Sequence, residues 1–245
     1  MEKVINKLMI ITLAAAVLFG AIAFLFRNAK HDSVIREELS FPMCEYIDID
    51  LLKLPVTVIP YDGEKISVSY TSDLPLVFAM GDNLLKVTES EEFVISLFTE
   101  RGAEFGLYMY LPDRLFRDIS VYSGTGSINI GRVDSYNISV ITNSGDIRCE
   151  NLLSHGSFTT STGKITVNYK EIITEAEIFS RNGDVELNFP AKSSVAVDFE
   201  TQTGRCVTDL WDRYVTGSYL YSFNGGRHVI KATLENGTLK INETN

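Results

Sequence analysis

The sequence is poor in the residues from which catalytic, metal and disulfide sites are built. It has three cysteines and three histidines in 245 residues. His31, His155 and His228 have no cysteine or carboxylate at ligand spacing, so we expect no metal site. Phosphate-binding loops, nucleophile elbows and zinc-protease motifs are also missing. We therefore predict no catalytic residues, no cofactor and no enzymatic activity. Glycan-cleaving enzymes on parallel β-helices need clustered carboxylates, whereas the acidic residues here are spread out.

Positive charge is scarce as well. The chain has 22 Lys and Arg against 32 Asp and Glu, a formal net charge of −10. Proteins that bind nucleic acid need clustered Lys and Arg against the phosphates, so we exclude nucleic acid as a partner. The 45% share of hydrophobic residues is that of a globular protein and excludes a disordered chain.

One long apolar run stands near the N-terminus. Residues 9–26 carry no charge and are flanked by Lys7 and Arg27. As a helix, the run would extend ~27 Å, close to the ~30 Å hydrocarbon core of a bilayer. We predict a transmembrane anchor at 9–26, after a tail at 1–8 and before a polar stalk at 27–45. A cleaved signal peptide is the alternative, but it would leave an apolar new N-terminus.

The charges around this run hardly decide its orientation, because Lys and Arg stand on both sides. Residues 1–36 carry +3, so residues 37–245 carry −13 of the total −10. An acidic domain is repelled by an anionic bilayer and is expected to stand off the membrane. We predict a single-pass membrane protein whose soluble domain is extracytoplasmic.

The body of the chain, over 119–208, is an internal repeat of about 19 residues. Apolar residues recur five before, two after and four after each repeat glycine, with Thr208 as the one exception, and a serine or threonine recurs three before it. The glycines are Gly126, Gly145, Gly163, Gly183 and Gly204. The hydroxyl residues are Ser123, Thr142, Thr160, Ser180 and Thr201.

Apolar residues two apart on both sides of a glycine indicate two short strands joined by a tight turn. Copies that match column by column favour stacking, which predicts an all-β, single-stranded β-solenoid of parallel coils over 46–241. We expect the glycines to supply positive φ, and the hydroxyls to bond the turn backbone or their neighbours in the stack. A degenerate last coil around Asn236–Gly237 and a tail at 242–245 would follow. A sandwich of β-hairpins is the alternative.

Two further expectations follow from sequential stacking. The residues after the glycines would form a ladder of alternating charge from the second onward; they are Ser127, Asp146, Lys164, Asp184 and Arg205. Cys149 and Cys206 would lie ~14 Å apart as buried thiols, too far for a disulfide. Cys44, in the stalk, would be open to an intermolecular disulfide or acylation.

The ordered set of motifs resembles a bacterial family known as putative adhesin domains of unknown function. The resemblance begins at LPVTVIPYDGEKISVSYTSD, continues through SGTGSINI, TNSGDIRC, TSTGKITV and SRNGDVEL, and ends at GGRHVIKATLENGTLKI. It implies a β-solenoid of the cell envelope and carries over no catalytic residue.

The edge opposite the glycines varies in length and carries aromatic residues, so we place the candidate binding site there. Its members are Tyr136, Tyr169, Phe189 and Trp211. The competing interpretation is that these rings cap the core. The predicted function is a non-enzymatic envelope binding or interaction module whose partner is an envelope protein or a glycan. The alternative is an envelope-stress sensor or regulator that acts through a membrane partner.

Overall fold

The computed structural model describes residues 35–90, 105–153, 155–208 and 212–244. Every regular element in these ranges is a strand, and none of the described residues belongs to a helix long and apolar enough to span a bilayer. The expected anchor at 9–26 lies outside the described residues. The strands are β1 (Ile35–Phe41), β2 (Tyr46–Leu51), β3 (Val56–Tyr61), β4 (Ile66–Ser72), β5 (Leu76–Gly81), β6 (Leu84–Glu89), β7 (Gly106–Pro112), β8 (Phe116–Ser123), β9 (Ile128–Ile130), β10 (Ser135–Thr142), β11 (Ile147–Leu152), β12 (His155–Thr160), β13 (Ile165–Tyr169), β14 (Ala176–Asn182), β15 (Val185–Pro190), β16 (Val195–Val207), β17 (Asp212–Phe223) and β18 (His228–Thr244).

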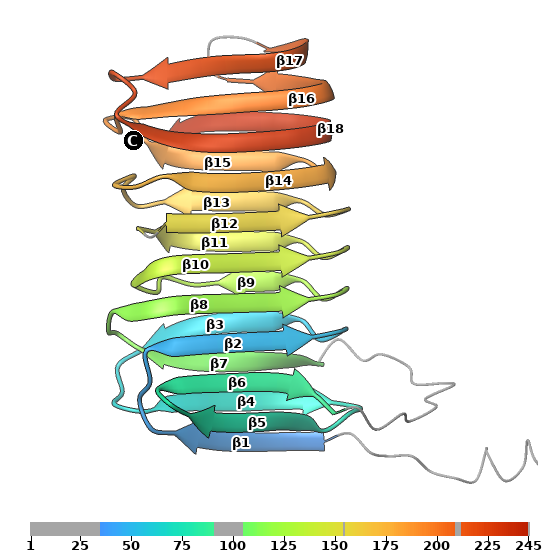
Figure 1. Cartoon of the computed structure of the whole chain (residues 1–245), viewed down its shortest axis with the longest axis vertical. Helices are drawn as coiled ribbons and strands as arrows, with labels where there is room; N and C mark the ends of the chain where they lie inside the picture. Colours follow the sequence, from blue (N-terminus) through green and yellow to red (C-terminus); the bar gives the residue numbers. More distant parts are fainter. Residues whose placement is uncertain (1–34, 91–104, 154, 209–211, 245) are drawn as a thin grey trace, which may run out of the picture. The chain divides into compact units, whose positions relative to one another are not determined.

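The strands stack as coils in two layers (Figure 1). The front layer runs β5, β6, β2, β8, β10, β12, β14, then the first halves of β18 and β16 and the second half of β17. The back layer runs β1, β4, β7, β3, β9, β11, β13, β15, then the remaining halves of β18, β16 and β17. Pairing from β6 and β7 up to β16 is parallel, and antiparallel strands cover both ends. The all-β solenoid with stacked coils is confirmed.

The coils do not stack in chain order at either end. β2 pairs with both β6 and β8, so the first coil is inserted between later ones. β18 pairs with β14 and β15 on one side and with β16 on the other. The coil of Gly237 therefore stacks on that of Gly183, and the coil of Gly204 follows it. The repeat predicted the coils correctly and their order wrongly.

This order ends the predicted ladder of alternating charge after Asp146, Lys164 and Asp184. Thr238, and not Arg205, lies next to Asp184 in the stack, and its backbone N–H donates to Asp184 Oδ1 over 2.7 Å. Likewise, the backbone N–H of Lys164 donates to Asp146 Oδ1 over 2.8 Å. The two carboxylates bind the backbone of the next coil and do not pair with side-chain cations across it.

Two boundaries also differ from the prediction. Residues 35–41, assigned to the stalk, form β1, which pairs antiparallel with β4 over its whole length. Asn242, assigned to the tail, belongs to β18, and its side-chain amide donates to Asn188 Oδ1 over 2.6 Å. Both segments pair with strands whose edges would otherwise be exposed. The need to cover an edge depends on the whole fold, so it cannot be recognised in the local sequence.

The hydroxyl column makes the contacts that define the turn edge. Thr142 Oγ1 accepts a hydrogen bond from the Gly145 N–H at 3.0 Å and donates to the Gly126 carbonyl in the adjacent coil at 3.3 Å. Ser123 repeats this geometry, accepting from the Gly126 N–H and donating to the Leu54 carbonyl. The prediction that these hydroxyls bond the turn and the neighbouring coil is confirmed. Thr201, in contrast, has a buried hydroxyl without a partner in the described chain.

The glycines are required for a reason other than the predicted one. None of the five has positive φ. Their backbones instead approach the adjacent coil so closely that a Cβ has no room. A Cβ at Gly163 would lie 2.0 Å from the Gly145 carbonyl oxygen, and one at Gly183 would lie 1.9 Å from the Gly163 oxygen.

We predict that Gly163→Ala lowers the free energy of unfolding by about 2–3 kcal/mol, because the coils must separate to admit the methyl group. The matched control is Gly81→Ala, since a Cβ at Gly81 meets nothing within 4 Å. Chemical denaturation of both variants measures the difference. Equal stabilities would contradict the close-approach account.

We also predict that Thr142→Val costs about 2 kcal/mol, because the Gly145 N–H and the Gly126 carbonyl both lose a buried partner. Thr201→Val, the same change in the same column, should leave stability within about 0.5 kcal/mol, since that hydroxyl has no partner to lose. Denaturation midpoints of the two variants check this. A larger loss for Thr201→Val than for Thr142→Val would count against it.

Candidate functional site

Four aromatic residues are predicted to form a binding edge, and the three that the structure describes do not share a surface. Tyr136, on β10, is 60% exposed. Tyr169 and Phe189 are buried, because both point inward in the alternation of β13 and β15, and the Phe189 ring packs edge-on against Phe223 at 5.3 Å. Trp211 lies outside the described residues. The competing interpretation, that the rings cap the core, holds for Tyr169 and Phe189.

The three cysteines are buried and therefore not accessible to reagents. All three are free and buried. Cys44 is only 1% exposed, and its thiol donates to the Tyr46 carbonyl, so the expected openness of Cys44 to cross-linking or acylation is wrong. Burial raises the pKa of Cys149 far above that of a free thiol, which excludes a reactive thiolate there. Within the ranges that the structure describes, no three His, Cys, Asp or Glu residues gather where a metal could bind.

On the back layer, polar side chains bind one another from coil to coil. The amides of Asn168, Asn188 and Asn242 form a ladder with donor–acceptor distances of 2.6 Å. Beside it, Lys164 and Lys240 both pair with Glu186, and the hydrogen bond from Lys164 holds the pKa of that carboxyl below its usual range. These groups stabilise the stack, and most of their hydrogen-bond donors and acceptors are already used within it.

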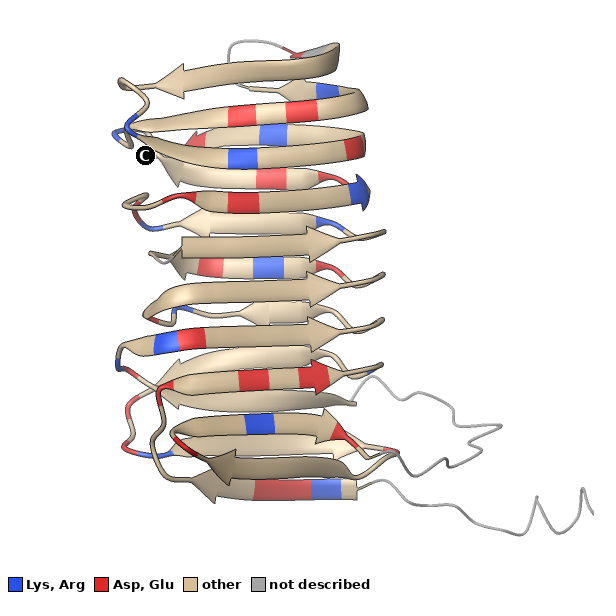
Figure 2. Cartoon of the chain, in the orientation of Figure 1, with Lys and Arg blue, Asp and Glu red and all other residues tan. Residues whose placement is uncertain are grey.

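The front layer is different, and its outer face carries the candidate site. Three serines stack in register on β8, β10 and β12: Ser120 opposite Ser139, and Ser139 opposite Ser157. Their side chains are half-buried and have no hydrogen-bond partner among the described residues. Figure 2 shows that β10 and β12 carry no charge, in a protein with an excess of ten negative charges.

A second outward column runs beside the serines and adds apolar surface. Tyr122, Ile141, Thr159 and Phe179 occupy it on successive strands. Ile141 is 38% exposed, and Asn143 donates a hydrogen bond to the Tyr122 hydroxyl over 3.2 Å. We define the front patch as these two columns, Ser120, Ser139, Ser157, Tyr122, Ile141, Thr159 and Phe179.

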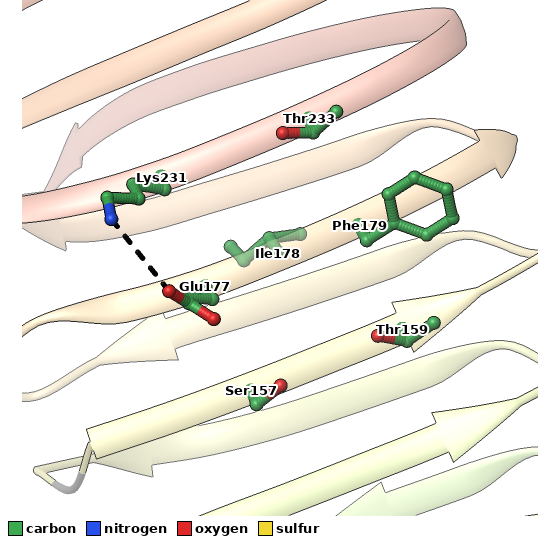
Figure 3. Close-up of a pocket in the computed structure, with 7 residues that line it drawn as sticks. All are labelled: Ser157, Thr159, Glu177, Ile178, Phe179, Lys231 and Thr233. Atoms are coloured by element: carbon green, nitrogen blue, oxygen red, sulfur yellow. Dashed lines mark ion pairs between the residues drawn. The ribbon is translucent and has the colours of Figure 1, made fainter.

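The upper end of the front patch is hollowed into a shallow groove of about 260 Å³ (Figure 3). The groove extends from Ser157 and Thr159 past Phe179 to Thr233 on β18. On one side of it, Lys231 Nζ lies 3.9 Å from Glu177 Oε1. Both partners are well exposed, so this ion pair contributes little to stability and is open to exchange for a ligand. The groove offers hydroxyls, one aromatic ring, one cation and one carboxylate.

The repeat contained the signal for this surface. The serines stand six residues before Gly126, Gly145 and Gly163, and the second column stands four before the glycines. In the alternation of each strand, these positions point outward and lie between the positions of the inward-pointing apolar columns. The prediction considered the connector edge and overlooked this face.

Comparison with known proteins places this architecture in a family. The family model of Toastrack DUF4097 matches residues 115–242, which is more than half of the chain. No curated protein matches the chain.

Two solved bacterial structures are similar over most of the chain. A putative cell adhesion protein from Clostridium sporogenes has 13% identity and a TM-score of 0.50, covering 86% of this chain and 100% of its own. A putative adhesin from Bacteroides fragilis has 12% identity and a TM-score of 0.43, covering 87% and 98% respectively. At such low identity the first of these shows a common fold alone. With the family match over β8–β18, the chain belongs to the Toastrack DUF4097 family.

Proposed function

We propose that this protein is a non-enzymatic binding module of the bacterial cell envelope, and that its front patch binds an uncharged glycan chain. The observation that carries the proposal is the row of stacked serines without partners, beside a column that contains aromatic rings. The two columns of the patch carry no charge, and β10 and β12 are uncharged over their whole length in an acidic protein (Figure 2). The description of the Clostridium sporogenes protein as a putative cell adhesion protein agrees with it.

The chemistry of the patch favours a sugar over other ligands. Sugar rings present C–H faces that pack on rings such as Phe179 and Tyr122, and hydroxyls that both donate to and accept from serine. A glycan lying along the stack meets an equivalent serine on three successive coils, every ~4.8 Å. An anionic polymer would be repelled by the acidic body. A protein partner would call for more apolar area than Ile141 and two half-buried rings supply.

The envelope location rests on the sequence. The apolar run at 9–26 has the length of a membrane anchor, and the remainder of the chain is strongly acidic. We propose that the anchor holds the β-solenoid outside the cytoplasm, where envelope glycans are accessible.

We predict that the full chain in detergent micelles binds neutral oligosaccharides on a glycan array, and that Phe179→Ala weakens this binding about tenfold by removing the stacking ring. The control is Ile173→Ala, which truncates an exposed apolar side chain outside the front patch. Titration by isothermal calorimetry against the strongest array ligand gives the affinities. Binding to no glycan, or equal loss in both variants, would refute the assignment.

We predict that Tyr136→Cys is labelled by a membrane-impermeant maleimide on cells with an intact cytoplasmic membrane, because Tyr136 is exposed. The unsubstituted chain is the control, since its three buried thiols should remain unlabelled. Labelling that requires lysis of that membrane would place the domain in the cytoplasm and exclude the envelope role.

A further inference from the structure

β17 leaves one long edge of the sheet without a partner. It is 12 residues long and pairs antiparallel with β16 on one side. No other strand in the described ranges pairs with its far side, and Figure 1 shows it at the end of the stack. Such an edge presents unpaired backbone N–H and C=O groups, which natural proteins normally protect.

The pairing of β17 with β16 shifts register next to Gly217, so the uninterrupted part of the edge is 217–223, and this part lacks the charged side chains that often protect an edge. Residues 214–223 include no charged side chain, and Leu220 is 68% exposed. The other end of the stack is less open: β5 is only six residues long, and β1 carries Arg36, Glu37 and Glu38. An uncharged, extended edge is suited to pairing with another strand.

The end of the core lies behind the same strand. Tyr219, Tyr221 and Phe223 pack against the core and remain only partly buried. The Tyr219 and Tyr221 rings are nearly parallel, with centroids 6.4 Å apart. A partner that extends the stack would bury these rings as well as pair the backbone.

The sequence of the strand identifies that partner. Residues 218–222 read Ser-Tyr-Leu-Tyr-Ser in both directions. In an antiparallel pair centred on Leu220, two copies would place Leu220 opposite Leu220, Tyr219 opposite Tyr221 and Ser218 opposite Ser222. Residues opposite each other point to the same side of a sheet, so the tyrosines of both copies would stay on the core side.

We propose that two copies of this chain associate end to end through β17, in an antiparallel pair centred on Leu220. The contact is isologous, as a two-fold axis requires. A single added peptide would leave a new unpaired edge one strand further out, whereas a second copy closes both edges at once. Because residues 214–223 are uncharged, two acidic domains meet here without placing like charges opposite each other. The inference does not depend on the glycan assignment.

The register is tested by cysteine cross-linking of the full chain in detergent micelles. Leu220→Cys should form a disulfide-linked dimer on mild oxidation, because opposite Cα atoms lie about 5 Å apart. Ser222→Cys is the matched control. Its two copies would lie ~13 Å apart, so it should not cross-link to itself but should cross-link to Ser218→Cys in a mixture. Self-linking of Ser222→Cys as strong as that of Leu220→Cys would overturn the proposal.

Association without a cross-link is measured by sedimentation velocity. Leu220→Lys places two like charges opposite each other and should raise the dimer dissociation constant about tenfold. Val77→Lys adds the same charge to the edge strand at the other end and should have no effect. Both variants keep residues 9–26, so any association through that segment is common to them. A chain that is monomeric at all concentrations, or a dimer that resists Leu220→Lys, would refute the proposal.

Discussion

The contact between each turn and the next coil is the constraint on which the structure depends. The hydroxyls of Ser123, Thr142 and Ser180 bond their own glycine turns. Those of Ser123, Thr142 and Thr160 reach a carbonyl in the adjacent coil. The glycine permits this approach because it has no Cβ. Alignment of the coils at this edge sets the strand register, and the register places apolar columns inside and leaves polar columns outside.

The turn edge and the outward columns differ in how freely their residues can be replaced. The turn edge is the most constrained part, because a Cβ on four of the five repeat glycines would lie within 2.2 Å of a backbone oxygen in the adjacent coil. The outward columns take no part in the turn contacts, so they can change without disturbing those contacts. On the back layer they are occupied by the asparagine ladder and by the pairs around Glu186. On the front layer the serine column of β8, β10 and β12 makes no such bonds, and the candidate binding surface lies there.

The sequence predicted what happens within a coil better than how the coils are ordered. The alternation of apolar residues around each glycine predicted the strands, and the hydroxyl column predicted the turn contacts. The spacing of a repeat reports the geometry of one coil, however, and Gly204 and Gly237 both have the apolar columns of the repeat, although Leu234 replaces the hydroxyl residue before Gly237. Only the pairing of β18 with β14 and β16 decides which of them stacks on Gly183. The predicted binding edge was wrong at Tyr169 and Phe189 for a related reason. Tyr169 and Phe189 were selected as aromatic residues near connectors, although the alternation points both inward.

The two proposed surfaces have a joint consequence. Because opposite residues of an antiparallel pair point to the same side, pairing through β17 would turn the front layers of both copies toward the same side. The two front patches would then form one surface on either side of the contact, without a change in either fold. A ligand as long as a glycan chain could bind both patches, and the second contact would form at a high effective concentration. A polymer that reaches both patches would therefore be held firmly even though each groove binds it weakly.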